Sequence, residues 1–437
     1  MSPFNLQTDK QPTLDQLAAD LKAVQAKDPT ILQKLTATQG GDFAGLSEDQ
    51  KWQYLEDQIN ASIDFVNNEP HTLGEIFHSR DPIGGLIQSV VNDGINPVLQ
   101  AFGEGNPVAW IPTGIDGILE RVRGKYPFQT ATAKSRIEFP AQCKIALLGD
   151  WGADNLHAKR IGDLAVARGA DYVIHLGDIY YSGTQSECEA FVGNWPLKGA
   201  DGKPMVGKSF ALNGNHEMYL EGKYYFTTVL GAFQQEASYF TLYNDWWQIQ
   251  GLDTAYVPFT IDGGGQDDRL QAQWDWLSDS VFSEPAKKNI FLSHNQPVSG
   301  HLPELEDAYV LKTQFLKFVA NRDYTRIQAW FFGHEHRCEI YDDSPVGSLF
   351  KARLIGNGSI PHAPETEDAA AIAANGAKAT AIWRVNKATV GDDQTTAISS
   401  FALLTFNNEK CTAEYINEDG SLFYKEDLSG GKNAEIV

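Results

Sequence analysis

Carboxylate, imidazole, amide and phenol side chains recur along this 437-residue chain, most of them close behind short apolar runs. Iron, manganese and zinc accept these side chains as ligands, so the set could hold metal ions. A carboxylate can bridge two ions about 3.5 to 4 Å apart, which suits a compact two-metal site. The candidate residues are Asp150, Asp178, Tyr181, Asn215, His216, His294, His334 and His336.

The spacing of the last two histidines adds to this interpretation. His334 and His336 flank Glu335, and residues two apart on a strand or extended turn point to the same side. Both rings could therefore approach neighbouring metals. A single Gly-Asp pair or a single histidine indicates little, because a plain turn or a hydrogen-bonded core residue explains it equally well. Several such pieces in one chain favour a common site.

The elements that must position these side chains are short strands. Buried strands are typical of apolar runs of this length. In α/β proteins, ligands bind at the carboxyl ends of the strands, where loops converge on a rigid sheet. The predicted strands cover 144–148, 172–176, 210–212, 289–293 and 329–332. Farther on, residues 400–406, 411–416 and 422–424 predict an antiparallel meander that completes a second sheet.

Residues 1–135 differ from the rest of the chain in their residue pattern, and we find no catalytic motif in them. Apolar residues spaced by three and four between residues 14 and 24 predict an amphipathic helix, and Ser47 with Gln50 resembles the capping box of a second. Glycines and prolines between residues 81 and 123 predict short broken helices that pack on the main domain rather than on a membrane. We therefore expect a helical N-terminal segment of unknown role, residues 1–135, and a catalytic domain, residues 136–437.

The composition restricts the class of protein. A net charge of -22 disfavours bulk nucleic-acid binding and anionic membrane surfaces, although a metal pocket can be locally positive. Four scattered cysteines favour reduced thiols over a disulfide framework. The N-terminus does not resemble a signal peptide, and we find no apolar stretch of roughly 18 to 20 residues. We expect a cytoplasmic protein without a transmembrane segment, and the oligomeric state stays open.

The candidate residues fall in five short blocks of the sequence, which are Gly149-Asp150-Trp151-Gly152, Gly177-Asp178-Ile179-Tyr180-Tyr181, Gly214-Asn215-His216-Glu217, Phe291-Leu292-Ser293-His294 and Gly333-His334-Glu335-His336. In order and rough spacing these blocks resemble those of the calcineurin-like metallophosphoesterases, and the resemblance covers about residues 143–425. The resemblance implies an α/β fold in which two mixed β-sheets pack together, flanked by helices in four layers. It implies hydrolysis of a phosphate ester by metal-activated water.

Two positions indicate the branch. Gly152 stands where many members have histidine, and Tyr181 stands three residues after the second aspartate, as in purple acid phosphatases. That likeness implies a trivalent iron and a second iron, manganese or zinc ion, bridged by Asp178. It implies that Tyr180 is structural, whereas a Tyr181 that packs against the sheet would leave a divalent pair. The first metal would be held by Asp150, Asp178, Tyr181 and His336, and the second by Asp178, Asn215, His294 and His334.

The expected activity is that of a phosphomonoesterase acting on a small phosphate ester. His216 would serve as general acid or oxyanion stabiliser, with Glu217 either orienting it or playing a structural part. Asn295 and His301 could contact substrate or cap a turn. A phosphodiesterase acting on nucleotides or lipid head groups is the alternative. A scaffold that binds a partner through residues 1–135 is a further one, which the full set of ligands disfavours.

Overall fold

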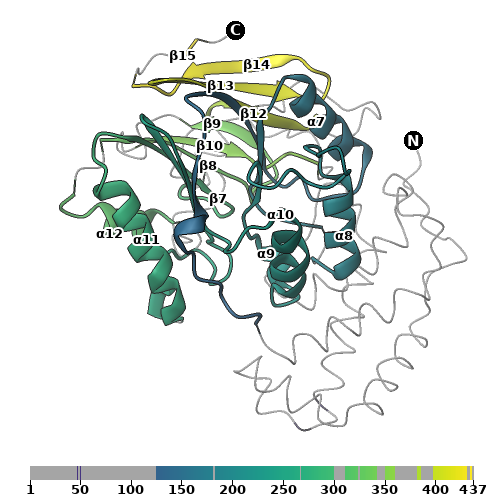
Figure 1. Cartoon of the computed structure of the whole chain (residues 1–437), viewed down its shortest axis with the longest axis vertical. Coiled ribbons are helices and arrows are strands. Elements are labelled where there is room, and N and C mark those ends of the chain that lie inside the picture. Colours follow the sequence, from purple (N-terminus) through teal and green to yellow (C-terminus); the bar gives the residue numbers. More distant parts are fainter. Residues whose placement is uncertain are drawn as a thin grey trace, which may run out of the picture.

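Two β-sheets pack face to face between two groups of helices in the computed structural model of the chain (Figure 1). The structure describes residues 47, 50, 125–180, 183–265, 267–299, 311–322, 325–341, 350–359, 381–384, 397–430 and 434–435. The four layers confirm the fold class predicted from the sequence.

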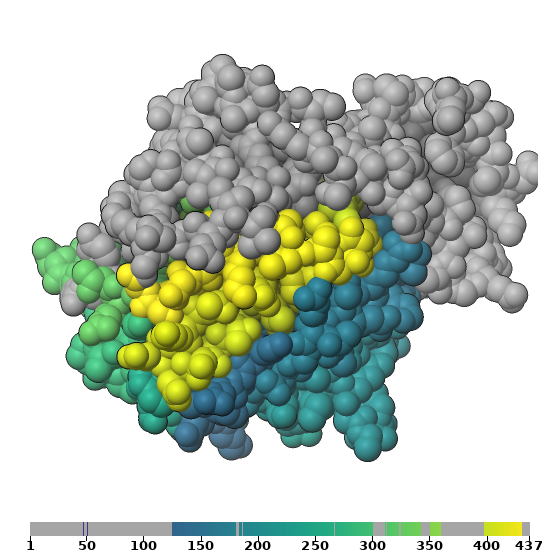
Figure 2. Space-filling view, turned by 90° about the horizontal axis from the view of Figure 1, so that it is seen from above, coloured from purple at the N-terminus to yellow at the C-terminus, as the bar shows by residue number. Residues whose placement is uncertain are grey.

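One sheet carries the first three predicted strands. Its order is β15-β14-β13-β12-β2-β3-β4, with β2, β3 and β4 parallel and β12 antiparallel to β2. The predicted meander, β12 to β14, is confirmed, and it extends this same sheet through the pairing of β12 with β2. In the space-filling view of Figure 2, the yellow C-terminal segment lies beside the blue one. The strands are β2 (Gln142–Leu148), β3 (Tyr172–His175), β4 (Ser209–Ala211), β12 (Ser400–Asn407), β13 (Lys410–Asn417), β14 (Leu422–Asp427) and β15 (Ala434–Glu435).

The other sheet carries the remaining two predicted strands, β7 and β8. Its order is β1-β5-β6-β7-β8-β10-β9-β11, and β6, β7, β8 and β10 run parallel to one another. All five strands predicted from the apolar runs are therefore confirmed. This sheet contains β1 (Arg136–Glu138), β5 (Phe240–Tyr243), β6 (Trp247–Gly251), β7 (Lys288–Ser293), β8 (Ile327–Phe332), β9 (Cys338–Tyr341), β10 (Lys351–Ile355) and β11 (Ala381–Arg384).

Apolar residues cover both faces of the central strands. In β2, Ile145 and Leu147 face the opposite sheet, whereas Ala146 and Leu148 pack under helices. In β7, Phe291 likewise packs among residues of α11 and α12. Side chains alternate between the two faces of a strand, so a strand buried on both faces becomes a continuous apolar run. That is why these strands are recognisable in the sequence.

Two of the helices, α7 and α8, begin at conventional side-chain caps. Asn155 accepts from the Ala158 N–H at the start of α7, and Thr184 forms a capping box with Glu187 at the start of α8. Among the described residues, no helix has the length and apolar character needed to cross a bilayer. The helices are α7 (Leu156–Ala167), α8 (Gln185–Asn194), α9 (Asn215–Met218), α10 (Leu230–Phe233), α11 (Gln271–Phe282) and α12 (Lys312–Val319), with shorter helical turns at η2 (Ala133–Ser135), η3 (Tyr225–Val229), η4 (Gly263–Gly265) and η5 (Asp268–Leu270).

The predicted capping box near the N-terminus is confirmed. The Ser47 N–H donates to Gln50 Oε1 at 2.9 Å, and the Gln50 N–H donates to Ser47 Oγ at 3.3 Å. The helices predicted around residues 14–24, 52–59 and 81–123 lie outside the described residues. The role of this segment therefore stays open. Residues 125–135 lie against the part of the chain that follows them, where Tyr126 stacks on Phe226 at 5.5 Å.

A buried ion pair joins the two sheets. Arg353 of β10 donates to both carboxylate oxygens of Glu426 in β14, at 2.7 and 2.8 Å. Tyr415 donates to the same carboxylate at 2.8 Å, and Lys351 lies 3.3 Å from it. Burial alone would raise the pKa of Glu426, but Arg353, Lys351 and Tyr415 together outweigh burial, and the pKa lies below its usual value. Glu426 is therefore ionised at neutral pH.

All four cysteines are buried free thiols, in line with the expectation from the sequence. Burial raises the pKa of Cys143 and of Cys338 to about 12. Cys143 and Cys411 are separated by β12, because both pair in register with Phe406. The cysteines therefore fill the core and have no nucleophilic role.

Candidate metal centre

The predicted ligands follow strands of both sheets and meet where the carboxyl ends of those strands converge. Asp150 and Asp178 follow β2 and β3, and Asn215 opens α9 after β4. His294 follows β7 directly, and His334 and His336 follow β8. The packing of the two sheets thus brings together residues that are almost 200 positions apart in the chain.

The acidic and histidine side chains form two groups, each able to hold one ion. Within a group, one potential ligand atom from each residue lies within 4.8 Å of the others. Asp178 belongs to both groups, which is the position that a bridging carboxylate needs. One group is Asp150, Asp178 and His336, and the other is Asp178, His294 and His334.

Asn215 completes the second group. Its side-chain oxygen lies 2.9 Å from His294 Nε2 and 2.8 Å from His334 Nδ1, and the two ring nitrogens are 3.1 Å apart. Tyr219 lies 3.1 Å from the Asn215 amide nitrogen, and this contact turns the amide oxygen toward the histidines. With both ring nitrogens unprotonated, these three atoms would repel one another unless a cation lay between them. The arrangement therefore fits a metal ion.

The protonation of His294 also suits a ligand. Its Nδ1 lies 3.2 Å from the Leu176 carbonyl oxygen, so that nitrogen carries the proton and Nε2 faces the group with its lone pair. Burial and the neighbouring His334 lower the pKa of His294 well below its usual value. A neutral imidazole is the form that binds metals.

The carboxylates of Asp150 and Asp178 are buried close together, where their ionised forms need positive charge nearby. Burial, followed by the charge of Asp178, raises the pKa of Asp150 well above its usual value. Burial raises the pKa of Asp178 to about 7. Two buried acids this close cannot both ionise cheaply without cations beside them.

Three of the candidate ligands have a strained backbone conformation. Asp150, Asp178 and His334 have φ values of 53°, 73° and 72°, in the left-handed region that non-glycine residues seldom adopt. Such conformations cost about 1 to 3 kcal/mol each and gather at functional sites, where the surroundings enforce them. Each of these turns redirects its side chain from the strand axis into the site.

Close contact between the ligand loops explains two glycines. A Cβ at Gly333 would lie 2.3 Å from Asp150 Oδ2. A Cβ at Gly152 would lie 2.3 Å from the Asp178 carbonyl oxygen. Gly152 occupies the position where many family members have histidine, so the packing of this chain leaves no room for that side chain.

Tyr180, expected to be structural, points into the first group instead. Its hydroxyl donates to Asp150 Oδ1 at 2.6 Å and lies 3.1 Å from Asp178 Oδ2 and 3.0 Å from His336 Nε2. Burial, Asp150 and Asp178 raise its pKa well above the usual value, so the phenol keeps its proton in this setting. The doubled tyrosine after Asp178 was the only sequence signal for this residue. Tyr181 lies outside the described residues.

His216 lies beside the shared carboxylate. Its backbone N–H donates to Asp178 Oδ1 at 3.1 Å, and its Nε2 lies 3.7 Å from Asp178 Oδ2. The ring packs between those of Tyr180 and Tyr219, at 4.6 and 4.8 Å. The site thus places an imidazole next to the candidate ligands.

Glu217 holds ligand loops together. Its Oε2 accepts from the backbone N–H groups of Asp178 and Gly214, both at 3.2 Å. Those contacts favour the structural part over the orienting one. Asn295, a candidate substrate contact, is only 1% exposed, and its side-chain oxygen has no hydrogen-bond partner within the described part of the chain. The other candidate, His301, lies outside the described residues, and both assignments stay predictions.

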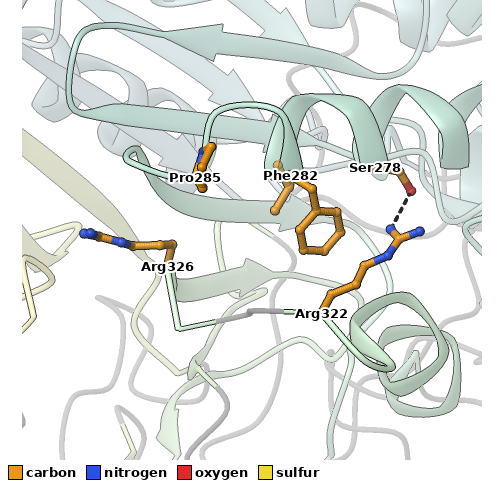
Figure 3. A pocket seen from close by; sticks show the side chains of 6 residues that line it. Ser278, Phe282, Pro285, Arg322 and Arg326 are labelled. Atoms are coloured by element: carbon orange, nitrogen blue, oxygen red, sulfur yellow. Dashed lines mark hydrogen bonds between the residues drawn. The ribbon is translucent and has the colours of Figure 1, made fainter.

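A pocket of about 500 Å³ lies elsewhere (Figure 3). Pro285 and Arg326 line it just ahead of β7 and β8, at the amino ends of these strands, and Arg322 donates to Ser278 Oγ at 3.2 Å. The candidate ligands lie at the carboxyl ends of the same strands. The pocket is therefore separate from the metal centre.

Two packed mixed sheets with this cluster at their converging strand ends define a metallophosphoesterase fold with a candidate dinuclear metal site. Residues 143–338 match the calcineurin-like phosphoesterase family. This part of the chain belongs to the calcineurin-like metallophosphoesterase superfamily. No curated protein matches the sequence significantly.

Several solved structures are similar to the chain at low identity. GAP50, the anchor in the inner membrane complex of Plasmodium, is 12% identical with a TM-score of 0.47, covering 66% of this chain and 88% of that one. The purple acid phosphatase PPD1 from yellow lupin (Lupinus luteus) seeds is 14% identical with a TM-score of 0.44, covering 66% of this chain and 54% of the lupin chain. A predicted phosphoesterase from Streptococcus pneumoniae is 10% identical with a TM-score of 0.28, covering 66% and 99%.

Proposed function

We propose that the protein is a phosphomonoesterase that hydrolyses small phosphate esters at a dinuclear metal site. The sharing of Asp178 by two ligand groups carries the proposal, because it suits two ions held side by side. Two such ions would supply positive charge for the phosphate oxygens and acidify a water molecule. A monoester dianion offers more charge to this centre than a diester does.

The side chains of the protein supply the remaining chemistry. His294 and Asn215 present lone pairs from fixed orientations, so little reorganisation accompanies substrate binding. His216 lies where it can donate a proton or a hydrogen bond to the departing alcohol oxygen. The reaction needs no covalent enzyme intermediate, and the buried cysteines offer no nucleophile for one.

Turnover of two chromogenic esters tests the proposal. We expect kcat/KM for p-nitrophenyl phosphate to exceed that for bis(p-nitrophenyl) phosphate by at least about tenfold in metal-loaded protein. The reverse order would establish the phosphodiesterase alternative. Binding of two metals per chain with no turnover of either ester would favour the scaffold alternative.

Replacing His216 should slow esters according to their leaving groups. We expect His216→Ala to lower kcat for an alkyl phosphate by about 10² to 10⁴, because an alkoxide needs a proton to depart. The effect on p-nitrophenyl phosphate should be much smaller, since nitrophenolate departs without one. Steady-state kinetics on both esters, with metal content measured in parallel, checks the prediction.

His216→Asn separates the two roles that this histidine could play. Asparagine can donate a hydrogen bond to an oxyanion but cannot deliver a proton. Recovery of most of the lost rate in this variant would identify oxyanion stabilisation. Equal losses on both esters, with two metals still bound, would remove His216 from any leaving-group role.

The position of Tyr180 leads to a spectroscopic prediction. With Fe(III) in the first group, we expect the purified protein to show a visible phenolate-to-iron absorption band. Tyr180→Phe should abolish that band, because the Tyr180 hydroxyl lies within 3.1 Å of all three members of the group. Tyr181→Phe is the matched control and should retain it.

The opposite result would assign the phenolate to Tyr181, as the likeness to purple acid phosphatases implies. A colourless protein with two divalent metals would keep the phosphoesterase function but exclude the purple branch. Metal analysis on protein purified without chelator distinguishes these outcomes. Iron, manganese and zinc all remain candidates for the second position.

A further inference from the structure

The ring of Phe259 lies against a candidate ligand on the side of the site that is open to solvent. Its centroid is 5.6 Å from that of His334, with an angle of 77° between the rings. Asn215 and His334 are the partly exposed members of the described ligand set, and the remaining members are buried. Phe259 is itself partly exposed. It therefore stands at the rim over which a substrate enters.

The backbone at Phe259 is strained. Its φ is 59°, in the left-handed region where a bulky residue is an outlier and glycine is the usual occupant. The Phe259 N–H donates to the Thr254 carbonyl oxygen at 2.9 Å and closes the turn that forces this conformation. Strain of this kind gathers at ligand-binding positions.

The turn that carries Phe259 is tied to two ligand-bearing loops. Asn213, just ahead of the ligand Asn215, lies 3.3 Å from both carboxylate oxygens of Asp253. The N–H of Asn295, which follows the ligand His294, donates to Thr254 Oγ1 at 3.1 Å. These bonds fix the start of the turn relative to the metal centre, so the ring is held in place before substrate arrives.

We infer that Phe259 selects the leaving group of the ester and favours aryl phosphates over alkyl phosphates. The inference rests on the function proposed above. Aromatic rings pack edge-to-face or offset on one another, and a ring held in advance loses little freedom on binding. A phosphate seated at the metal centre places its ester oxygen, and therefore its aryl group, within reach of this rim. The preferred substrates are monoesters of phenols, including phosphotyrosine side chains.

Leaving-group selection is tested with phenyl phosphate and propyl phosphate. Phe259→Ala should lower the ratio of their kcat/KM values by about tenfold, the size expected for one aromatic contact. Phe259→Tyr, which keeps the ring, should leave that ratio within about twofold of the wild type. A ratio unchanged in Phe259→Ala overturns the inference. Equal losses on both esters would do so too, because they would show only that Phe259 positions His334.

Binding without turnover keeps this test independent of the proposed function. Calorimetry on metal-loaded protein should show phenylphosphonate binding more tightly than methylphosphonate in the wild type. Phe259→Ala should remove most of that difference. If the wild type hydrolyses neither ester but still shows this Phe259-dependent preference, the proposed hydrolase function is wrong and the aryl-binding site is supported. Active protein without the preference refutes only the aryl site.

Comparing Ala with Gly at residue 259 measures the strain directly. Both variants lose the ring, and glycine is normally the less stable of the two because it gains more freedom on unfolding. At a left-handed position the order should reverse, with Phe259→Gly melting a few degrees above Phe259→Ala. The usual order would show that the turn does not hold residue 259 in the left-handed region, and the argument for a fixed ring would fail.

Discussion

Replacing Asp178 by asparagine is expected to abolish metal binding and activity while stabilising the metal-free protein. Both ligand groups lose their shared carboxylate, so we expect kcat/KM to fall by at least about a thousandfold. Metal content should fall below two ions per chain. The neutral amide no longer repels Asp150, whose pKa the charge of Asp178 helps to raise.

The pH dependence follows from the sign of the shift. Burial raises the pKa of Asp178 to about 7 in the folded chain, above the value of about 4 for an exposed aspartate. The metal-free protein therefore loses stability as the pH rises from about 4 through about 7, because ionising a buried carboxyl is costly. Asp178→Asn should remove most of this pH-dependent loss and raise the free energy of unfolding of the metal-free protein near pH 7 by about 4 kcal/mol.

Asp163→Asn is the matched control, because Asp163 lies on α7 with its side chain 67% exposed. Thermal unfolding of chelator-treated and metal-loaded samples separates the two effects. In the wild type, added metal should raise the melting temperature, and in Asp178→Asn that gain should disappear. A variant that keeps two metals and full turnover would contradict the assignment of Asp178 as the bridge.

Breaking the ion pair between the sheets should have the largest effect on stability. Glu426→Gln keeps the shape of the side chain but leaves the buried guanidinium of Arg353 without its counter-charge. Removing one partner of a buried pair typically costs about 3 to 5 kcal/mol. Urea unfolding followed by fluorescence measures the loss.

The pH dependence of this effect has the opposite sign to that of Asp178. Because the folded pKa of Glu426 is lowered, its contribution is present above the unfolded pKa and fades as the pH falls below about 4. The difference between the wild type and Glu426→Gln should shrink over that range. The double variant Arg353→Met with Glu426→Met removes both charges and should recover most of the loss. A single variant as stable as the wild type would show that the pair contributes nothing.

The strands that carry the candidate ligands could be predicted because burial on both faces makes them continuous apolar runs. β6 escaped prediction because Gln248 and Gln250 interrupt it, although both are fully buried. Gln250 donates to Gln248 Oε1 at 3.0 Å and to Asn289 Oδ1 at 3.1 Å. Polar side chains that bond to one another inside a sheet interrupt the apolar run by which a buried strand is recognised in the sequence.

The candidate site could be predicted only in part, for a similar reason. The polar residues behind each predicted strand pointed to a common edge, and the structure places them there. Tyr180 faces the candidate ligands because of the backbone at Asp178, whose φ of 73° turns the chain away from a strand path. The spacing of residues in the sequence does not indicate this change of chain direction. The position of Phe259 depends on hydrogen bonds between distant segments and was equally hidden.

The place of β12 in its sheet dictates the order of events during synthesis. β12 pairs with β2, yet about 250 residues separate the end of β2 from its start. Until those residues leave the ribosome, β2 presents an open, apolar edge, and unpaired edges of this kind invite association with other chains. β2 can therefore gain its β12 neighbour only late in synthesis, and the nascent chain carries this edge unpaired until β12 has been made.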